Sequence, residues 1–122
     1  MSRTILVVDD SGLARRGTRR ILEGAGYTIL EAEDGMGALE RYFVDKPDLV
    51  LLDLVMKGMY GLEVLTKLRE LDPGARVIVI SADIQTTSRD LVSAAGASGF
   101  LNKPAKAEDI VAAVQQAIAQ GT

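Results

Sequence analysis

Five short apolar runs alternate with longer stretches of helical periodicity, and this alternation constrains the fold more than any other feature of the sequence. The runs lie at residues 4–8, 27–32, 48–52, 76–81 and 99–102. The first, TILVV, is continuously apolar and rich in β-branched residues, which is typical of a strand buried on both faces. We therefore predict five strands at these positions.

Apolar residues at helical spacing separate and follow these runs. The last stretch shows this most plainly, with apolar residues at i, i+1, i+4, i+7 and i+8 counted from Ile110. Glycines and the segment Asp72-Pro73-Gly74 mark the ends of the helical stretches. Strands that alternate with helices in this way form parallel sheets through right-handed crossovers. We therefore predict an α/β fold with five helices: a three-layer α/β/α sandwich around a five-stranded parallel sheet.

Composition excludes several classes of function. The chain has 122 residues, which suits one domain, and we expect a single domain over residues 1–122 with no linker or internal repeat. It contains no Cys and no His, so the usual zinc, iron–sulfur and haem ligands are missing. Catalysis by Cys–His or Ser–His arrangements is excluded for the same reason. Any chemistry must come from carboxylates and other oxygen ligands.

The charge and the apolar runs also bear on partners and location. A formal net charge of −3 argues against a nucleic-acid-binding surface across the chain. The apolar runs are only as long as strands, so we expect no membrane insertion. The N-terminus MSRTILVVDD lacks a signal-peptide pattern, because its apolar run ends in two Asp residues. We expect a cytoplasmic location.

Polar residues follow or end four of the predicted strands, namely Asp9-Asp10, Asp53, Ser81 and Lys103. In open parallel sheets the functional crevice lies at the carboxyl ends of the strands. Each residue alone has an ordinary alternative as a turn residue, a helix N-cap or a solvated charge. Together, three carboxylates repel one another, and a single lysine offsets only part of their charge. This deficit suits a divalent metal, and all-oxygen ligands favour Mg²⁺, or Mn²⁺, over zinc or copper.

Four motifs in this order carry a family resemblance: VVDDS, LLDLVMKGMYGLEVL around Asp53, ISA at Ser81, and GFLNKP ending in Lys103-Pro104. With them the chain resembles the receiver domain of two-component response regulators, most closely the stand-alone type related to the chemotaxis response regulator. The resemblance covers essentially the whole chain. It implies the flavodoxin-like strand order 2-1-3-4-5, which is known for members of this family.

The resemblance also implies a chemistry for the strand ends. Asp53 would be the phosphoacceptor, receiving a phosphoryl group from the phosphohistidine of a histidine kinase or phosphotransfer protein. A carboxylate nucleophile attacking an anionic phosphoryl group needs charge compensation and positioning more than acid–base help. The chain would thus be no enzyme beyond its own metal-dependent phosphorylation and dephosphorylation. The implied ligands of Mg²⁺ are Asp9, Asp10, Asp53 and the backbone carbonyl of Val55.

The same resemblance implies a switch. Lys103 would pair with one phosphoryl oxygen and Ser81 would donate its hydroxyl to another. Ser81 would move toward the phosphoryl group, and Phe100 would rotate into the space that it leaves. These movements would remodel the face of the fourth helix, fifth strand and fifth helix, including Gln85 and Arg89, for a target protein such as a chemotaxis or motor component. A plain core role is the alternative for Phe100. The family also implies a cis peptide bond before Pro104.

Some positions depart from the family pattern. Lys57 stands where Pro is usual, and it either tunes the site or is a solvated loop lysine. Val55 and Asp83 occupy the positions that modulate access of water to the acyl phosphate in this family. Val55 has no group to orient water, so we expect moderate to slow autodephosphorylation.

The first helical stretch carries four arginines, Arg15, Arg16, Arg19 and Arg20, which lie on two adjacent rows of one helix. By the resemblance, this helix docks the kinase or phosphotransfer domain, and an arginine-rich surface would attract an acidic partner. A solvated face balanced by Glu23 and other acids is the alternative.

Rival functions differ in the residues that they need. An FMN-binding protein is disfavoured, because Asp9-Asp10 would repel the phosphate after the first strand. A phosphatase with an aspartate nucleophile would carry a D-x-D arrangement there, whereas these two acids are adjacent. Two alternatives stay open: a degenerate receiver that binds partners without phosphorylation, and the receiver fragment of a larger DNA-binding or enzymatic regulator.

Overall fold

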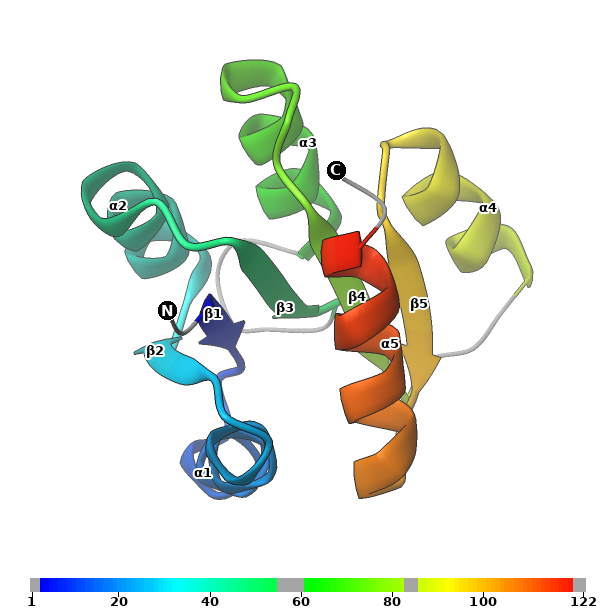
Figure 1. The fold of residues 1–122 in the computed structure, drawn as a ribbon. Coiled ribbons are helices and arrows are strands. Elements are labelled where there is room, and N and C mark those ends of the chain that lie inside the picture. The colour runs from blue at the N-terminus through cyan, green and yellow to red at the C-terminus, as the bar shows by residue number, and fades with distance from the viewer. Residues whose placement is uncertain (1–2, 55–60, 83–85, 120–122) are drawn as a thin grey trace.

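The computed structural model describes residues 3–54, 61–82 and 86–119. One parallel sheet runs through the molecule, with its strands in the order β2-β1-β3-β4-β5 (Figure 1). The strands are β1 (Thr4–Val8), β2 (Thr28–Ala32), β3 (Leu49–Asp53), β4 (Val77–Ser81) and β5 (Gly99–Asn102). The helices are α1 (Gly12–Gly24), α2 (Gly35–Asp45), α3 (Gly61–Leu71), α4 (Thr86–Ala94) and α5 (Ala107–Ala119). The predicted fold class and strand order are confirmed.

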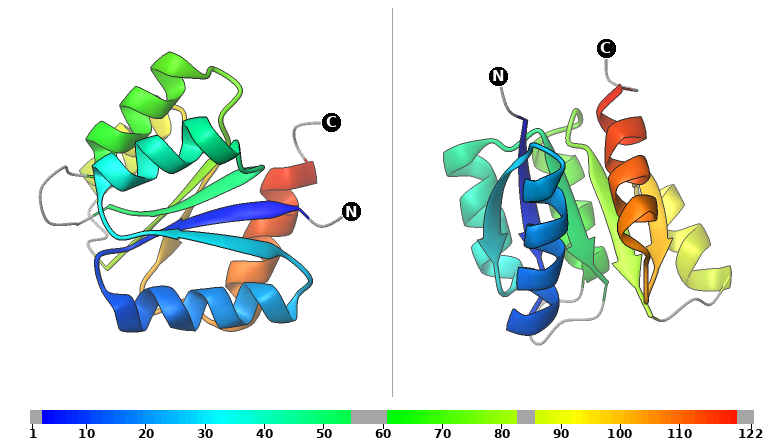
Figure 2. Two further views of the ribbon diagram at one scale, coloured as in Figure 1. Left: turned by 90° about the vertical axis from the view of Figure 1, so that its left-hand side faces the viewer. Right: turned by 60° about the horizontal axis from the view of Figure 1, so that its bottom comes forward.

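Helices cover both faces of the sheet (Figure 2). On one face α1 and α5 pack on alternate residues of the strands, such as Ile5 and Leu51, through buried side chains that include Leu22 and Val114. On the other face α2, α3 and α4 pack on the intervening strand residues. The sheet thus has a hydrophobic core on each face, because successive side chains of a strand point to opposite faces.

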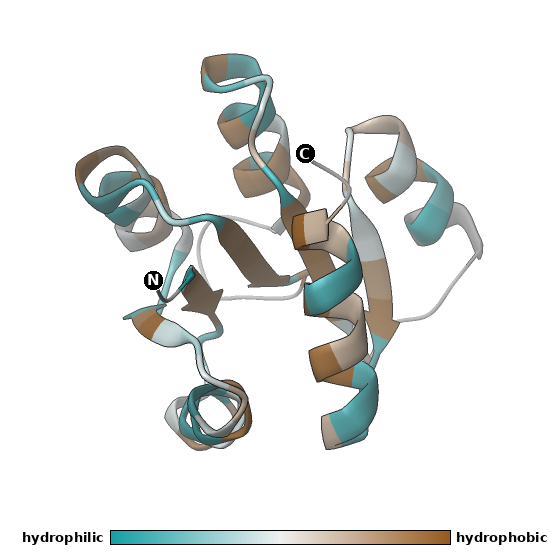
Figure 3. Cartoon of the chain, in the orientation of Figure 1, coloured by the Kyte–Doolittle hydropathy of each residue, from teal (hydrophilic) through white to brown (hydrophobic). Residues whose placement is uncertain are grey.

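The central strands are apolar along their length, as their brown colour in Figure 3 shows. Every residue of β3 and β4 is buried, which is why these runs read as continuous rather than alternating. Three predicted strands start one residue late in the structure, and β3 extends to Asp53 instead of ending before it. The extension occurs because Asp53 still pairs with Ile80 across the sheet.

Side-chain caps begin two of the helices. Ser11 accepts a hydrogen bond from the Ala14 amide at 3.2 Å at the start of α1, and Asp34 accepts one from the Gly37 amide at 2.7 Å at the start of α2. In the part of the chain that the structure describes, no helix combines the length and the apolar character that crossing a bilayer requires.

Candidate functional site

The loop after β1 carries two adjacent acids. Asp9 is buried, with 5% of its surface exposed, whereas Asp10 is exposed. The Asp9 amide donates to the carbonyl of Ala32, the last residue of β2, at 3.2 Å. The Asp9 Oδ1 atom accepts a hydrogen bond from the Ser11 amide at 2.9 Å. The backbone of the loop is thus anchored next to the sheet. Asp9 and Asp10 lie at the edge where the parallel strands end.

Asp53 occupies the centre of this edge as the last residue of β3, with 7% of its surface exposed. Gly61, the first residue of α3, lies directly against the backbone of Asp53 and Leu54. Its amide donates to the Leu54 carbonyl at 2.9 Å. A Cβ atom at Gly61 would lie 2.6 Å from the carbonyl oxygen of Asp53 and 2.6 Å from the Leu54 Cα atom. Only glycine therefore allows α3 to begin this close to Asp53.

Lys103 joins the two buried acids. Its Nζ atom donates to Asp9 Oδ2 at 2.9 Å and to Asp53 Oδ2 at 3.1 Å. Burial works to lower the pKa of the Lys103 ammonium, but the hydrogen bonds and negative charges of Asp9 and Asp53 together raise that pKa above its ordinary value. The ammonium is therefore charged at neutral pH. The Lys103–Pro104 peptide bond is cis, as the family resemblance implies.

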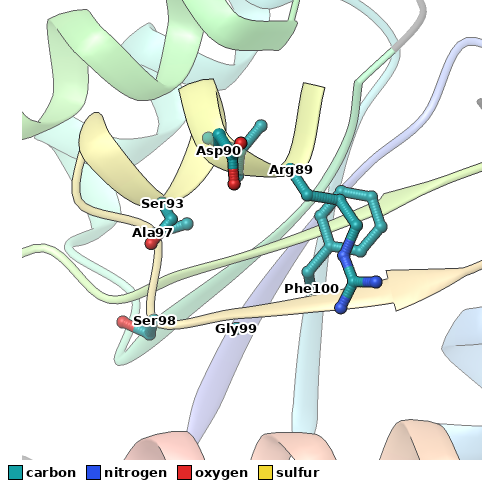
Figure 4. A pocket seen from close by; sticks show the side chains of 8 residues that line it. Arg89, Asp90, Ser93, Ala97, Ser98, Gly99 and Phe100 are labelled. Carbon is teal, nitrogen blue, oxygen red and sulfur yellow. The ribbon is translucent and has the colours of Figure 1, made fainter. Parts of the chain in front are cut away.

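Ser81 and Phe100 lie in the two neighbouring strands, β4 and β5. Ser81 is fully buried, and its carbonyl accepts a hydrogen bond from the Lys103 amide at 2.9 Å. Phe100 is half-buried, and the Arg89 guanidinium carbon lies 5.4 Å from the centre of its ring. Phe100 and Arg89 line a cavity of about 490 Å³ between α4 and β5 (Figure 4).

The three acids fit a small divalent cation. Asp9, Asp10 and Asp53 each offer a carboxylate oxygen, and these oxygens lie within 4.8 Å of one another. Lys103 brings one positive charge to two of the three carboxylates. A compact set of oxygen ligands with excess negative charge is what Mg²⁺ prefers in proteins. Val55, whose carbonyl was predicted as a further ligand, lies outside the described residues, as do Lys57, Asp83 and Gln85.

Asp9, Asp10, Asp53, Ser81 and Lys103 meet at the carboxyl edge of the sheet, whereas Phe100 lies inside β5, beside α4. The four arginines of α1 do not form one free surface. Arg15 and Arg19 both bind Glu31 on β2, and Arg19 also binds Glu23. The sequence reasoning missed the part that Gly61 and Glu31 play beside the site. A polar residue inside an otherwise apolar strand was the available signal for Glu31.

Comparisons with known proteins agree with this geometry. The family model for the response regulator receiver domain matches residues 5–115. The chemotaxis protein CheY of Halobacterium salinarum is 34% identical over 118 residues, which cover 97% of this chain and 98% of that protein. The response regulator MprA of Mycobacterium ulcerans is 39% identical over 112 residues, which cover 92% of this chain but 48% of that protein. The chain thus spans about half the length of MprA.

Solved structures give the same result. The crystal structure of a CheY-like response regulator receiver domain protein from Methanospirillum hungatei superposes with a TM-score of 0.95. The two chains are 26% identical, and the superposition covers 99% of this chain and 97% of the other. The whole architecture, and not only the sheet, is therefore shared with that structure.

Proposed function

The chain belongs to the response regulator receiver domain family, and we propose that it is a phosphorylation-activated switch of a two-component phosphorelay with Asp53 as the phosphoacceptor. The observation that carries this proposal is the single ammonium of Lys103 placed between the buried carboxylates of Asp9 and Asp53. A buried acid cluster of this kind is costly for stability. Its position at the carboxyl edge of a parallel sheet is where ligands bind in such folds.

The proposed reaction is a phosphoryl transfer. An oxygen of the Asp53 carboxylate forms a bond to phosphorus, while the bond between phosphorus and the donor's imidazole nitrogen breaks, and the imidazole leaves with the electron pair. Lys103 faces the developing charge on the phosphoryl oxygens, and Ser81 donates its hydroxyl to one of them. This arrangement supplies positioning and charge stabilisation, which is what phosphoryl transfer requires of a protein.

A bound Mg²⁺, or Mn²⁺ in its place, would be held by Asp9, Asp10 and Asp53, with the Val55 carbonyl as the further ligand that the family resemblance implies. Such an ion supplies positive charge to the phosphoryl oxygens. The acid cluster and its excess negative charge support this assignment.

Phosphorylation would act through Ser81 and Phe100. The phosphoryl group adds about two negative charges and three acceptor oxygens to the edge of the sheet. Ser81 then moves toward it, and Phe100 turns inward beside α4. The cavity next to Phe100 supports this movement, because it leaves space at the ring. The altered face of α4, β5 and α5 would bind a downstream target protein, such as a chemotaxis or motor component.

The remaining assignments follow from this role. We propose a histidine kinase or phosphotransfer protein as the phosphodonor, a cytoplasmic location, and one functional receiver unit over residues 1–122. The match to CheY supports a switch that acts by binding a target protein. The match to half of MprA supports the alternative of a receiver within a larger DNA-binding or enzymatic regulator.

Intact-mass spectrometry after incubation with acetyl phosphate and Mg²⁺ tests the assignment of Asp53. The wild-type chain should gain one phosphoryl group, and Asp53→Asn should gain none, because its amide cannot form the acyl phosphate. Asp45→Asn, which alters an acid on α2 away from the site, is the matched control and should be labelled like the wild type. Equal labelling of Asp53→Asn would refute the acceptor. An unlabelled wild type would instead favour a degenerate receiver that binds partners without phosphorylation.

A further inference from the structure

We propose that Arg15 is a positioning residue for the acid pair: it holds the peptide group between Asp9 and Asp10, and Glu31 orients it for that task. This inference rests on the proposed function, because it concerns the binding of a divalent cation by these acids. It gives Arg15 an inward role in place of the docking role that the arginine-rich helix suggested.

The contacts of Arg15 are short and specific. Its Nη1 atom donates to the backbone carbonyl of Asp9 at 2.7 Å, and its Nε atom donates to Glu31 Oε1 at 2.8 Å. The side chain of Arg15 is only 16% exposed. Hydrogen bonds from a charged donor are stronger than those between neutral groups. The planar guanidinium can make both bonds at once, which an ammonium group cannot do in the same geometry.

The pairing of β2 with β1 positions Glu31 beside Arg15. Glu31 pairs with Val7 on β1 and lies on the same face of β2 as Ile29, which packs in the core beneath α1. Arg15 and Arg19 are one helical turn apart, so both reach the same carboxylate. Arg19 binds the second oxygen, Oε2, at 2.5 Å. Hydrogen bonds from Arg19 and then Arg15 hold the pKa of Glu31 below its ordinary value, so the carboxylate stays charged.

The bond to the Asp9 carbonyl constrains Asp10 as well. The Asp9 carbonyl and the Asp10 amide belong to one planar peptide group. Fixing the direction of that carbonyl therefore fixes the plane from which the Asp10 backbone continues. With its amide on Ala32, its carbonyl on Arg15 and its carboxylate on Ser11 and Lys103, Asp9 is held at each polar group.

This arrangement has a consequence for cation binding. Adjacent carboxylates repel each other, and a free loop would separate them. A loop already held in the binding conformation loses less conformational entropy when a cation binds. Groups that orient metal ligands typically change metal affinity by about 10–100-fold when they are removed. Arg15 should therefore act on the affinity for Mg²⁺ and not on the chemistry at Asp53.

Isothermal titration with Mg²⁺ tests this role. Arg15→Met keeps the apolar stem but removes both hydrogen bonds. It should raise the dissociation constant for Mg²⁺ by about tenfold. Arg19→Met is the matched control: it removes an arginine from the same Glu31 carboxylate but leaves the bond to the Asp9 carbonyl, and its affinity should stay within about twofold of the wild type. Equal affinity of Arg15→Met and the wild type, or equal weakening in both variants, would overturn the inference.

Phosphorylation by acetyl phosphate at varied Mg²⁺ separates positioning from a general structural defect. Arg15→Met should need more Mg²⁺ for half-maximal rate and reach the wild-type rate at saturation. Arg15→Lys, which restores one donor, should recover part of the affinity. Glu31→Gln keeps the shape of the network without its charge, so it tests the same role should Arg15→Met not fold, and it should also weaken Mg²⁺ binding. An unchanged Mg²⁺ requirement in both Arg15→Met and Glu31→Gln contradicts the inference.

The wild-type titration distinguishes this inference from the proposed function. A wild-type chain that binds no Mg²⁺ would overturn the proposed function together with the role of Arg15. A wild-type chain that binds Mg²⁺ and is labelled at Asp53, beside an Arg15→Met variant of equal affinity, would overturn only the role of Arg15.

Discussion

The loop after β1 and the strand β5 both border the acid site, but they are built very differently. Asp9 in the loop is buried and hydrogen-bonded at each of its polar groups. By contrast, no residue of β5 is fully buried, and α4, which packs beside it, exposes 52% of Leu91. A cavity of about 490 Å³ is lined by residues of both α4 and β5. Regions with few buried contacts are the ones that open at low free-energy cost.

This difference suits the two tasks proposed for the site. The side that would bind a cation gains from rigidity, because the ligands are held before binding. The side that would signal gains from loose packing, because Phe100 needs space in which to turn. One sheet can thus carry a rigid site and a loosely packed face that are separated by two strands.

Truncating one side chain of α1, the helix that follows the β1 loop, and one side chain of β5 should reveal the difference most strongly. Leu22 on α1 is fully buried, so Leu22→Ala should lower the free energy of unfolding by about 3 kcal/mol. Phe100 is half-buried beside a cavity, so Phe100→Ala should cost only about half as much despite removing more atoms. Urea denaturation measures both values. Equal or greater destabilisation by Phe100→Ala would contradict the loose packing of the β5 side.

Adding one methyl group beside Asp53 should lower the free energy of unfolding nearly as much. In Gly61→Ala the new Cβ atom would meet backbone atoms of Asp53 and Leu54 at 2.6 Å, so α3 must shift, at a cost of about 2 kcal/mol. Phosphorylation of Asp53 should slow as well. The matched control is Gly17→Ala, whose Cβ atom would meet nothing within 4 Å and which should stabilise α1 by about 0.5–1 kcal/mol. Equal stability of the two variants would show that the backbone at Asp53 is not rigid.

Protonation of Glu31 at low pH should lower the free energy of unfolding by less than either substitution above. The folded-state pKa of Glu31 is lowered, so its contribution is present above the unfolded pKa and is lost as the pH falls through the folded value. Between pH 7 and pH values below the ordinary glutamate range, the wild type should lose about 1 kcal/mol or less through this group. Glu31→Gln should be less sensitive to acid by that amount in urea titrations. Glu40→Gln, an exposed acid on α2, should leave the sensitivity unchanged.

Much of the fold was predictable because buried parallel strands demand continuous apolar runs. The five runs were therefore visible, and their ends agree with the strand ends to within one residue. The last residue of β3 was missed because pairing across the sheet decides it. The acids and Lys103 were predictable as candidates for the same reason: polar residues directly after a buried strand stand out. Their distances were not predictable, since they depend on how β1, β3 and β5 are staggered.

The roles of Arg15 and Gly61 could not be read in advance. Four arginines on one helix do not show which row faces the sheet, and the rotation of α1 is set by the packing of Leu22. Gly61 reads as an ordinary helix start until the Asp53 carbonyl is found beside it.

The order of the elements, the faces that they bury and the acids at the edge of the sheet follow from the amino-acid sequence alone. These properties depend on the period of apolar residues and on residue type, which are local. The contacts of the Lys103 ammonium with two of the acids, and those of Arg15 with Glu31 and the Asp9 carbonyl, depend instead on the folded arrangement. Such contacts join residues from different strands and helices, so they exist only once the sheet has assembled.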